Sequence, residues 1–165
     1  MSVAALRWVF QEHQASRHHY DLRLEVDGVL KSWAVPRGPS MNTRVRRLAQ
    51  PVPDHEMDQL LREGPEGPGR GTIVWDTGTY TMVPGRAGAG SVAAALAAGH
   101  LKVVLEGNKL RGGFALTRTR PPPSERWIWV KMRDDLAASG EIAIEQPASV
   151  LSGRTLADLL HESLS

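Results

Sequence analysis

The stretch YDLRLEVDGVLKSWAV, residues 20–35, decides the fold class. In residues 20–26, apolar or aromatic side chains alternate with charged ones, which is the two-residue period of a strand with one buried face. Asp27 and Gly28 are the residue types that most readily adopt the left-handed backbone of a two-residue hairpin turn, and residues 29–35 are again strand-like. The stretch therefore predicts an antiparallel β-hairpin.

Strand-like runs continue through most of the chain. They are short and are separated by Gly, Asn and Pro, which favours an antiparallel β-sandwich or β-barrel. The runs are TIVWD (72–76), TYTMV (79–83), LKVVLEG (101–107), LRGGFALTRT (110–119) and RWIWVKM (126–132). Four tryptophans in strand-like runs are expected in the core, with base stacking by one of them as the alternative: Trp33, Trp75, Trp127 and Trp129.

Helices are expected to be few and short. The pattern predicts a helix over residues 42–49 and another over residues 91–98, with Ser91 as its N-terminal cap and Gly99 as its stop. A third helix is predicted to start at Thr155. We therefore expect a mainly β fold with a few flanking helices.

Charge is distributed unevenly along the chain. Residues 1–133 hold 19 Lys and Arg against 12 Asp and Glu, whereas residues 134–165 hold 1 against 6. The basic excess suits a nucleic-acid backbone, but a solvated surface without a partner explains it equally well. The length suits one compact domain. We expect this domain in residues 1–135, followed by an acidic tail with a short helix in residues 136–165.

The composition excludes several classes of protein. The chain has no cysteine, so disulfides and thiolate metal sites are excluded and any metal needs nitrogen and oxygen ligands. No apolar run approaches the roughly 20 residues of a membrane span, and charged residues come too early for a signal peptide. We therefore expect a cytoplasmic protein without membrane contact.

The polar face of the first hairpin carries the most distinctive chemistry. His19, Asp21 and Arg23 are spaced by two, so their side chains leave the strand on the same side. The imidazole and the carboxylate can bind a divalent cation, with His13 as a third ligand if residues 14–17 form a turn. Arg23 would lie beside this cation, where a guanidinium can bind phosphate. A surface network of salt bridges is the alternative, and the spacing does not decide between the two.

The segment around this face resembles a known family. QEHQASRHHYDLRLEVDGVLKSWAVPRGPS, residues 11–40, is similar nearly residue for residue to the opening signature of the phosphoesterase domain of bacterial DNA ligase D, a module of end-joining repair that also occurs as a free-standing protein. Over roughly residues 8–135, further segments resemble the family in the same order: RVRRLA, the Asp54-His55 pair, Glu63-Gly64, IVWDTGTY, LKVVLEGNKLRGGFAL and WVKMRD.

The resemblance implies a closed antiparallel β-barrel and a metal-dependent enzyme that heals DNA 3′ ends. Such an enzyme removes a 3′-terminal ribonucleoside, leaves a 3′-phosphate, and can then remove that phosphate. The implied cofactor is a divalent metal, most simply Mn²⁺, with Zn²⁺, Co²⁺ or Fe²⁺ as alternatives. The implied partners are DNA 3′ ends with a terminal ribonucleotide, and a repair ligase and polymerase that act in trans.

The resemblance also assigns residues by position. The implied metal ligands are His13, His19 and Asp21, and the implied catalytic residues are His19, Asp21, Arg23 and His55. The implied phosphate-binding residues are Arg23, His55, Arg37 and Arg47, and the supporting residues are Gln11, Glu25 and Gln59. Glu25 is expected to orient a nearby basic residue. His55 is either a general acid for the leaving oxygen or a hydrogen-bond donor to phosphate, and the sequence does not separate these roles.

The chain departs from the family near the implied phosphate site. Arg37, Pro53 and Gln59 stand where the family usually has Lys, Glu and Tyr. Proline cannot replace a carboxylate, and glutamine lacks the phenolic hydroxyl. The loop within residues 63–76 is also shorter than in the family and lacks the tyrosine that the family has there. We therefore expect the diesterase step to be kept and removal of the 3′-phosphate to be weakened.

Two other functions compete with this one. A catalytically impaired nucleic-acid-binding or docking module of a repair complex would keep the barrel without a working phosphate site. Two-histidine phosphodiesterases that use no metal need a pair of His-x-Thr/Ser motifs. Only His161-Glu-Ser fits that pattern here, so the pair is incomplete.

Overall fold

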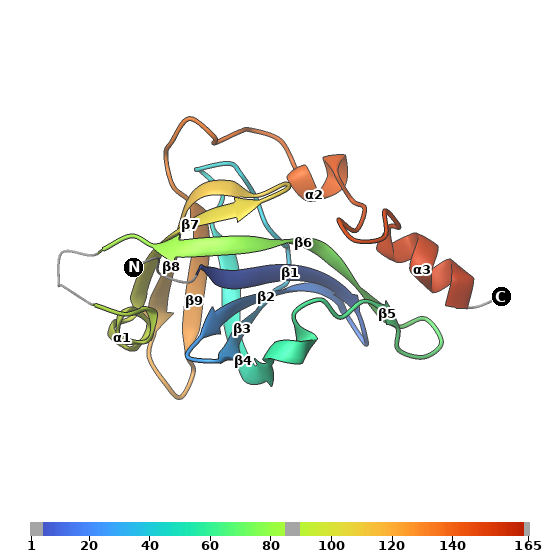
Figure 1. Cartoon of the computed structure of the whole chain (residues 1–165), viewed down its shortest axis with the longest axis horizontal. Coiled ribbons are helices and arrows are strands. Elements are labelled where there is room, and N and C mark those ends of the chain that lie inside the picture. The colour runs from blue at the N-terminus through green and yellow to red at the C-terminus, as the bar shows by residue number, and fades with distance from the viewer. Residues whose placement is uncertain (1–4, 85–89, 164–165) are drawn as a thin grey trace.

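Eight strands form a closed antiparallel β-barrel (Figure 1). The computed structural model describes residues 5–84 and 90–163; residues 1–4 and 85–89 of the expected domain and residues 164–165 of the expected tail lie outside this part. Around the barrel the order is β1-β2-β3-β4-β9-β8-β7-β6, β6 pairs with β1 to close it, and β5 pairs with the first residues of β6. The strands are β1 (Leu6–Gln14), β2 (His18–Val26), β3 (Val29–Val35), β4 (Arg47–Glu56), β5 (Gly64–Pro65), β6 (Gly71–Met82), β7 (His100–Gly107), β8 (Arg111–Arg120) and β9 (Arg126–Lys131). The expectation of a mainly β, closed antiparallel barrel is confirmed.

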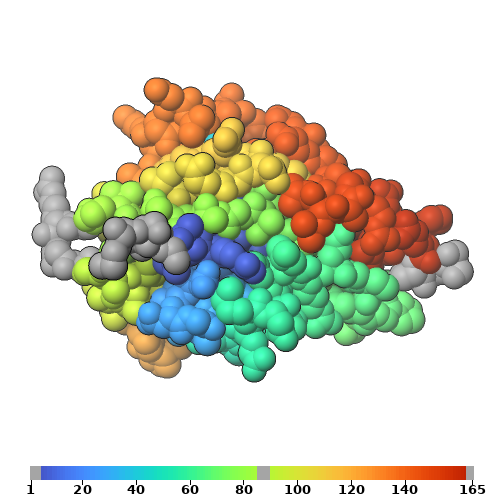
Figure 2. Space-filling view, viewed as in Figure 1, coloured from blue at the N-terminus to red at the C-terminus, as the bar shows by residue number. Residues whose placement is uncertain are grey.

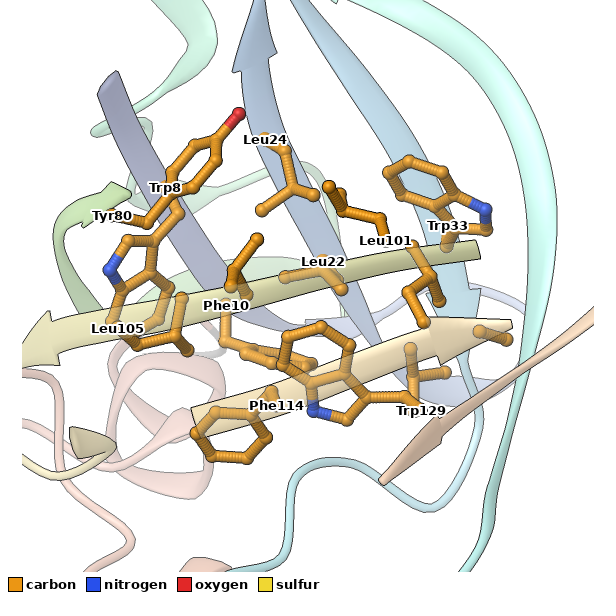
Figure 3. Close-up of a cluster of buried hydrophobic side chains, with 14 of the residues drawn as sticks. Trp8, Phe10, Leu22, Leu24, Trp33, Tyr80, Leu101, Leu105, Phe114 and Trp129 are labelled. Atoms are coloured by element: carbon orange, nitrogen blue, oxygen red, sulfur yellow. The ribbon is translucent and has the colours of Figure 1, made fainter. Parts of the chain in front are cut away.

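β2 and β3 form the predicted hairpin. Asp27 and Gly28 have φ angles of 51° and 83°, which is the left-handed backbone that a two-residue turn requires. The alternation of β2 directs Leu22 and Leu24 into the barrel interior, where they meet aromatic side chains from other strands (Figure 3). The four tryptophans predicted for the core are at most 4% exposed: Trp33, Trp75, Trp127 and Trp129. The other face of β2 is left to its polar residues.

Two predicted strands are one strand in the structure. Residues 72–76 and 79–83 were expected to be separated by a turn, but β6 runs on between them without a break. Gly78 permits this, because a Cβ at this position would lie 1.8 Å from the Glu106 carbonyl oxygen of the neighbouring strand β7. The glycine therefore serves close pairing of two strands and does not mark a chain reversal.

The helix predicted over residues 42–49 is wrong. The Asn42 side chain accepts a hydrogen bond from the Arg44 amide, and the Val45 amide donates to the Asn42 carbonyl, which closes a single turn. From Arg47 onward the chain is strand β4 and pairs with β9 and β3. An asparagine turn competes locally with a helix, and the pairing of residues 47–49 with β9 decides the outcome.

β1 and β4 are strands that the sequence pattern does not predict. Pro51 and Pro53 argue against a strand, because proline donates no backbone hydrogen bond. β4 pairs with β9 only over residues 47–49, so both prolines lie where β4 has a strand neighbour on one side alone.

The two other predicted helices are confirmed. Ser91 caps α1 (Val92–Ala98), and Gly99 ends it in the left-handed conformation. α3 (Leu156–Ser163) begins after Thr155, whose hydroxyl accepts a hydrogen bond from a backbone amide of the first turn. Figure 1 shows α1 and α3 toward opposite ends of the barrel.

The C-terminal segment packs on the outside of the barrel. It contains α2 (Ile142–Glu145), which was not predicted, and then Gln146, whose carbonyl accepts a hydrogen bond from the buried Trp75 indole at 2.9 Å. Leu159 of α3 packs on Ile73 of β6. In the space-filling view this segment, in red, lies directly beside the green region around β5 (Figure 2). Within the described residues, no helix has both the length and the apolar character needed to cross a membrane.

Candidate metal centre

The candidate site lies on the outer face of the β1–β2 hairpin. The register places His13 opposite His19 and Gln11 opposite Asp21. Since the apolar residues of β2 fill the barrel, His19, Asp21 and Arg23 project from the other side. The turn expected over residues 14–17 is present and joins the two strands, so the hairpin brings His13 to His19.

A cover of irregular chain buries this polar face. It consists of the short helix η1 (Met57–Gln59) and the loop that leads to β5. Leu60 fixes the cover by packing on an apolar patch of three strands: Val9, Leu30 and Val74. As a result Asp21 is 6% and Arg23 is 8% exposed, and a small cavity of about 110 Å³ remains beside them.

Three ligand atoms converge at the edge of the cavity, which His13 and Asp21 line. His13 Nδ1 lies 3.3 Å from His19 Nε2 and 3.7 Å from Asp21 Oδ2, and His19 Nε2 lies 3.3 Å from Asp21 Oδ2. His19 Nδ1 lies 3.1 Å from the Arg17 carbonyl, which can only accept, so this nitrogen carries the proton and Nε2 offers its lone pair. Two imidazole nitrogens and one carboxylate oxygen suit a divalent metal ion, and the residues present fit one.

The carboxylate of this group is ionised. Burial alone would raise the pKa of Asp21, but the charge of Arg23 and the hydrogen bonds that His13 and His19 donate when their rings carry both protons outweigh it and hold that pKa well below its usual range. The hydrogen bond to Asp21 raises the pKa of the His19 imidazole against the effect of burial. The cluster therefore presents an anionic oxygen among basic groups, which is the state that binds a cation.

Arg23 is held in place by an almost complete set of partners. Its Nε donates to Gln11 Oε1 at 2.7 Å, and its Nη1 donates to Ser32 Oγ at 2.8 Å and lies 3.0 Å from His55 Nδ1. Nη2 lies 3.5 Å from Asp21 Oδ2. Burial lowers the pKa of Arg23 and the Asp21 charge opposes this, but a guanidinium stays protonated. Nη2 is the guanidinium nitrogen that can still bind an anion next to the three ligand atoms.

Gln11 connects the cover to Arg23. This side chain is 2% exposed, and its Nε2 donates to the carbonyls of Gln59 and Arg62 at 3.1 and 3.2 Å. Its Oε1 accepts from Arg23. All of its polar atoms are used, so Gln11 fixes the position of the guanidinium relative to the covering loop.

His55 enters the site from β4. Its Nδ1 lies 3.0 Å from both Arg23 Nη1 and the Pro53 carbonyl oxygen. A guanidinium only donates and a carbonyl only accepts, so Nδ1 bonds to one of these two partners at a time. When Nδ1 accepts from Arg23, the ring proton is on Nε2, which can then donate to a ligand. Gln59 also lines the cavity, where its side chain accepts a hydrogen bond from Arg62.

Three residues of the predicted site, Arg37, Arg47 and Glu25, neither line this cavity nor belong to the ligand cluster. Arg37 and Arg47 line a separate depression of about 340 Å³, where Arg47 pairs with Glu141 of the C-terminal segment at 3.2 Å. Glu25 accepts a hydrogen bond from the backbone amide of Arg7 at 2.9 Å, so this carboxylate binds a main-chain group where a basic side chain was expected.

Residues that were not predicted also belong to the site. Glu66 Oε1 lies 3.0 Å from His13 Nε2, and Thr72 and Arg62 line the same cavity. No pattern marks Glu66, because its approach to His13 depends on the path of a loop. Ser32 could have been found, because the Asp27-Gly28 turn fixes the register that pairs it with Arg23.

The fold and the site define a class of protein. The protein is a closed β-barrel, and one outer face carries two imidazoles, a carboxylate and a buried guanidinium. This face combines a candidate metal centre with an anion site. Residues 11–118 match the family described as DNA Ligase D 3′-phosphoesterase domain. The chain belongs to this family and is a phosphoesterase domain, as the resemblance implied.

Three curated relatives support this assignment. The chain is 45% identical over 164 residues to the multifunctional non-homologous end joining protein LigD of Pseudomonas aeruginosa, over 94% of this chain and 19% of that protein. It is 39% identical to the LigD protein of Mycobacterium tuberculosis over 77% of this chain and 16% of that protein. The corresponding values for Mycolicibacterium smegmatis LigD are 37%, 82% and 18%. The chain thus spans less than a fifth of the length of these relatives.

Proposed function

We propose that this chain is a metal-dependent phosphoesterase that acts on DNA 3′ ends, removing a 3′-terminal ribonucleoside and leaving a 3′-phosphate. The observation that carries the proposal is the convergence of His13 Nδ1, His19 Nε2 and Asp21 Oδ2 beside the guanidinium of Arg23. These atoms supply a cation site and an anion site in one cavity. A phosphodiester held by both sites is activated for hydrolysis.

His13, His19 and Asp21 would hold the ion, which we propose to be Mn²⁺, with Zn²⁺, Co²⁺ and Fe²⁺ as alternatives. When bound, a divalent ion polarises a phosphoryl oxygen and lowers the pKa of a bound water. The side chains contribute through their fixed orientation, because His19 Nδ1 donates to the Arg17 carbonyl and so keeps its proton.

Arg23 and His55 would bind the phosphoryl group. Arg23 Nη2 neutralises charge that develops on a phosphoryl oxygen, and it is already oriented by the bonds of the other guanidinium nitrogens to Gln11 and Ser32. Because His55 Nδ1 is in contact with this same guanidinium, we propose that His55 Nε2 donates to the same phosphate. The general-acid role is the alternative, and His55→Ala separates the two. An equal loss on substrates with good and poor leaving groups supports the donor role, whereas rescue by a good leaving group supports the acid role.

The metal dependence is tested by Mn²⁺ titration of the wild type beside His19→Ala and Asp21→Ala. The substrate is a DNA primer that ends in one ribonucleotide. We expect hydrolysis to require the metal and each substitution to lower kcat by at least about 10²-fold. Hydrolysis that is unaffected by both substitutions would remove the proposal.

We further propose that removal of the 3′-phosphate is weakened in this chain. Pro53 offers His55 only a backbone carbonyl, and the Gln59 side chain is bound to Asp58 and Arg62. A terminal phosphate dianion needs more donors than a diester, and neither residue supplies one comparable to a tyrosine hydroxyl. We expect the 3′-phosphate product to accumulate. Clean conversion to a 3′-hydroxyl by the wild type would contradict this, and Gln59→Tyr is expected to raise the second rate.

The relatives are named as end-joining repair proteins, so we propose the same role for this chain, in the cytoplasm, with a ligase and a polymerase supplied in trans. The differences at Pro53 and Gln59 favour one second candidate, a catalytically impaired module that binds nucleic acid or docks in a repair complex. Binding of a 3′-ribonucleotide primer without hydrolysis under Mn²⁺, Zn²⁺, Co²⁺ or Fe²⁺ would favour that candidate.

A further inference from the structure

A carboxylate contacts the side of His13 that faces away from the candidate metal position. Glu66 Oε1 lies 3.0 Å from His13 Nε2, whereas His13 Nδ1 faces His19 and Asp21. The ligand atoms of the cluster are those of His13, His19 and Asp21, and Glu66 is not one of that group within the described residues. Glu66 therefore touches a proposed ligand without being one itself.

The backbone around Glu66 is built to hold this side chain in place. The Glu66 amide donates to the Arg70 carbonyl at 2.9 Å, and the Arg70 amide donates to the Gly67 carbonyl at 3.0 Å, which closes the loop between β5 and β6. Thr72, at the start of β6, pairs with His13 of β1 on one side and with β5 on the other. The sheet register therefore brings the Glu66 loop next to His13.

Two side chains fix the orientation of the Glu66 carboxylate. Thr72 Oγ1 donates to Glu66 Oε1 at 2.7 Å, and Arg62 Nη2 lies 3.1 Å from Glu66 Oε2. The side chains of Glu66 and His13 are each about a quarter exposed. With both oxygens engaged, the carboxylate cannot rotate away from His13 without losing a contact.

We propose that Glu66 is a positioning residue of the metal centre: it keeps the proton of neutral His13 on Nε2, so that Nδ1 offers its lone pair to the metal. The Arg17 carbonyl does the same for His19 from the opposite nitrogen of that ring. Carboxylates and carbonyls that orient metal-bound histidines raise metal affinity about 10- to 100-fold. The proposal rests on the proposed function only in taking His13 as a metal ligand.

The test measures Mn²⁺ affinity by isothermal titration for wild type, Glu66→Gln and Glu66→Ala, with exposed Glu106→Ala as the matched control. We expect the dissociation constant to rise about 10- to 100-fold in Glu66→Ala and to be unchanged in the control. Glu66→Gln should fall between, because its amide oxygen still accepts the Nε2 proton but carries no charge.

Imidazole ¹⁵N spectra of the metal-free protein supply a readout that a loss of stability does not mimic. Wild-type His13 should be in the Nε2–H form, and Glu66→Ala should show a mixture of both forms. Suppose that Glu66→Ala keeps the wild-type Mn²⁺ affinity and His13 tautomer, while His13→Ala binds Mn²⁺ at least tenfold more weakly. This result would overturn the role of Glu66 and leave the proposed metal centre standing. If His13→Ala also keeps wild-type affinity, the proposed metal centre itself is overturned. If Glu66→Ala does not fold, Thr72→Val, which removes one contact to the carboxylate, must weaken affinity for the inference to stand.

Discussion

Replacing Arg23 by lysine separates the charge of this residue from its shape. The guanidinium sends N–H groups in fixed directions to Gln11 Oε1 at 2.7 Å and to Ser32 Oγ at 2.8 Å. Lysine keeps the positive charge but has one nitrogen at the end of a flexible chain, so it cannot reach both acceptors in these positions. The substitution therefore leaves at least one polar group in the buried site without its donor.

The expected loss follows from these contacts. A hydrogen bond with a charged donor contributes about 1.5–3 kcal/mol, and an unsatisfied buried acceptor costs about 1–3 kcal/mol. These two figures describe the same loss, so if lysine remakes one of the two bonds, Arg23→Lys lowers the free energy of unfolding by about 1.5–3 kcal/mol. For a chain of this size, that corresponds to a fall in Tm of about 3–12 °C.

Urea unfolding in the presence of a chelator measures this loss without a contribution from metal binding. Arg111→Lys, at an exposed position on β8, is the control and should change the free energy of unfolding by less than about 0.5 kcal/mol. If Arg23→Lys lowers the free energy of unfolding no more than the control does, at an equal m-value, the fixed geometry of the guanidinium does not hold the site together. With saturating Mn²⁺, we also expect kcat/KM on the primer substrate to fall about 10²- to 10³-fold.

Three further predictions concern the barrel. Partial burial raises the pKa of Asp134, but hydrogen bonds from backbone amides and Lys131 outweigh burial and hold this pKa at about 2, below its value in the unfolded chain. The Asp134 carboxylate therefore stabilises the fold above about pH 4, and this stabilisation is lost as the pH falls toward 2. Asp134→Asn should cost about 1 kcal/mol at pH 7 and flatten the stability profile between pH 4 and 2 in acid-series urea unfolding; equal slopes in both proteins would contradict this. Asp76 is fully buried and accepts hydrogen bonds from three backbone amides at 2.8–3.1 Å, so Asp76→Ala should lower the urea-measured free energy of unfolding by about 3–5 kcal/mol, and a loss below 1 kcal/mol would count against this. Gly78→Ala should cost more than about 3 kcal/mol, because the new Cβ would lie 1.8 Å from the Glu106 carbonyl oxygen, and a wild-type melting temperature by calorimetry would refute the close approach.

Local patterns predicted the parts of the fold that local chemistry controls. The alternation of residues 20–26 and the Asp27-Gly28 turn gave the hairpin, and Ser91 and Gly99 gave the ends of α1, because turns and caps depend on neighbouring residues. The predicted helix over residues 42–49 is wrong, since the pairing of residues 47–49 with β9 overrides the intrinsic preference of that segment.

The same distinction applies to the candidate site. Spacing along β2 placed His19, Asp21 and Arg23 on one face, because strand geometry has a fixed period. The contact of Glu66 with His13 is not encoded in any local pattern, since it depends on the β5–β6 loop and on the cover that Leu60 anchors. Loop paths are set by tertiary packing, which a sequence pattern does not report.

The hairpin that carries the proposed ligands has a consequence for the order of folding. His13, His19 and Asp21 are close in sequence, whereas barrel closure pairs β1 with the distant β6, and contacts of such long sequence separation form slowly. A metal ion can therefore bind the β1–β2 hairpin before the barrel closes, whereas the contact of Arg23 with His55 of β4 has a longer sequence separation and is expected to form later. An ion that also binds partly folded forms of the chain stabilises the native state less than its affinity for that state indicates. Mn²⁺ should therefore raise the melting temperature by less than its Kd for the native protein implies.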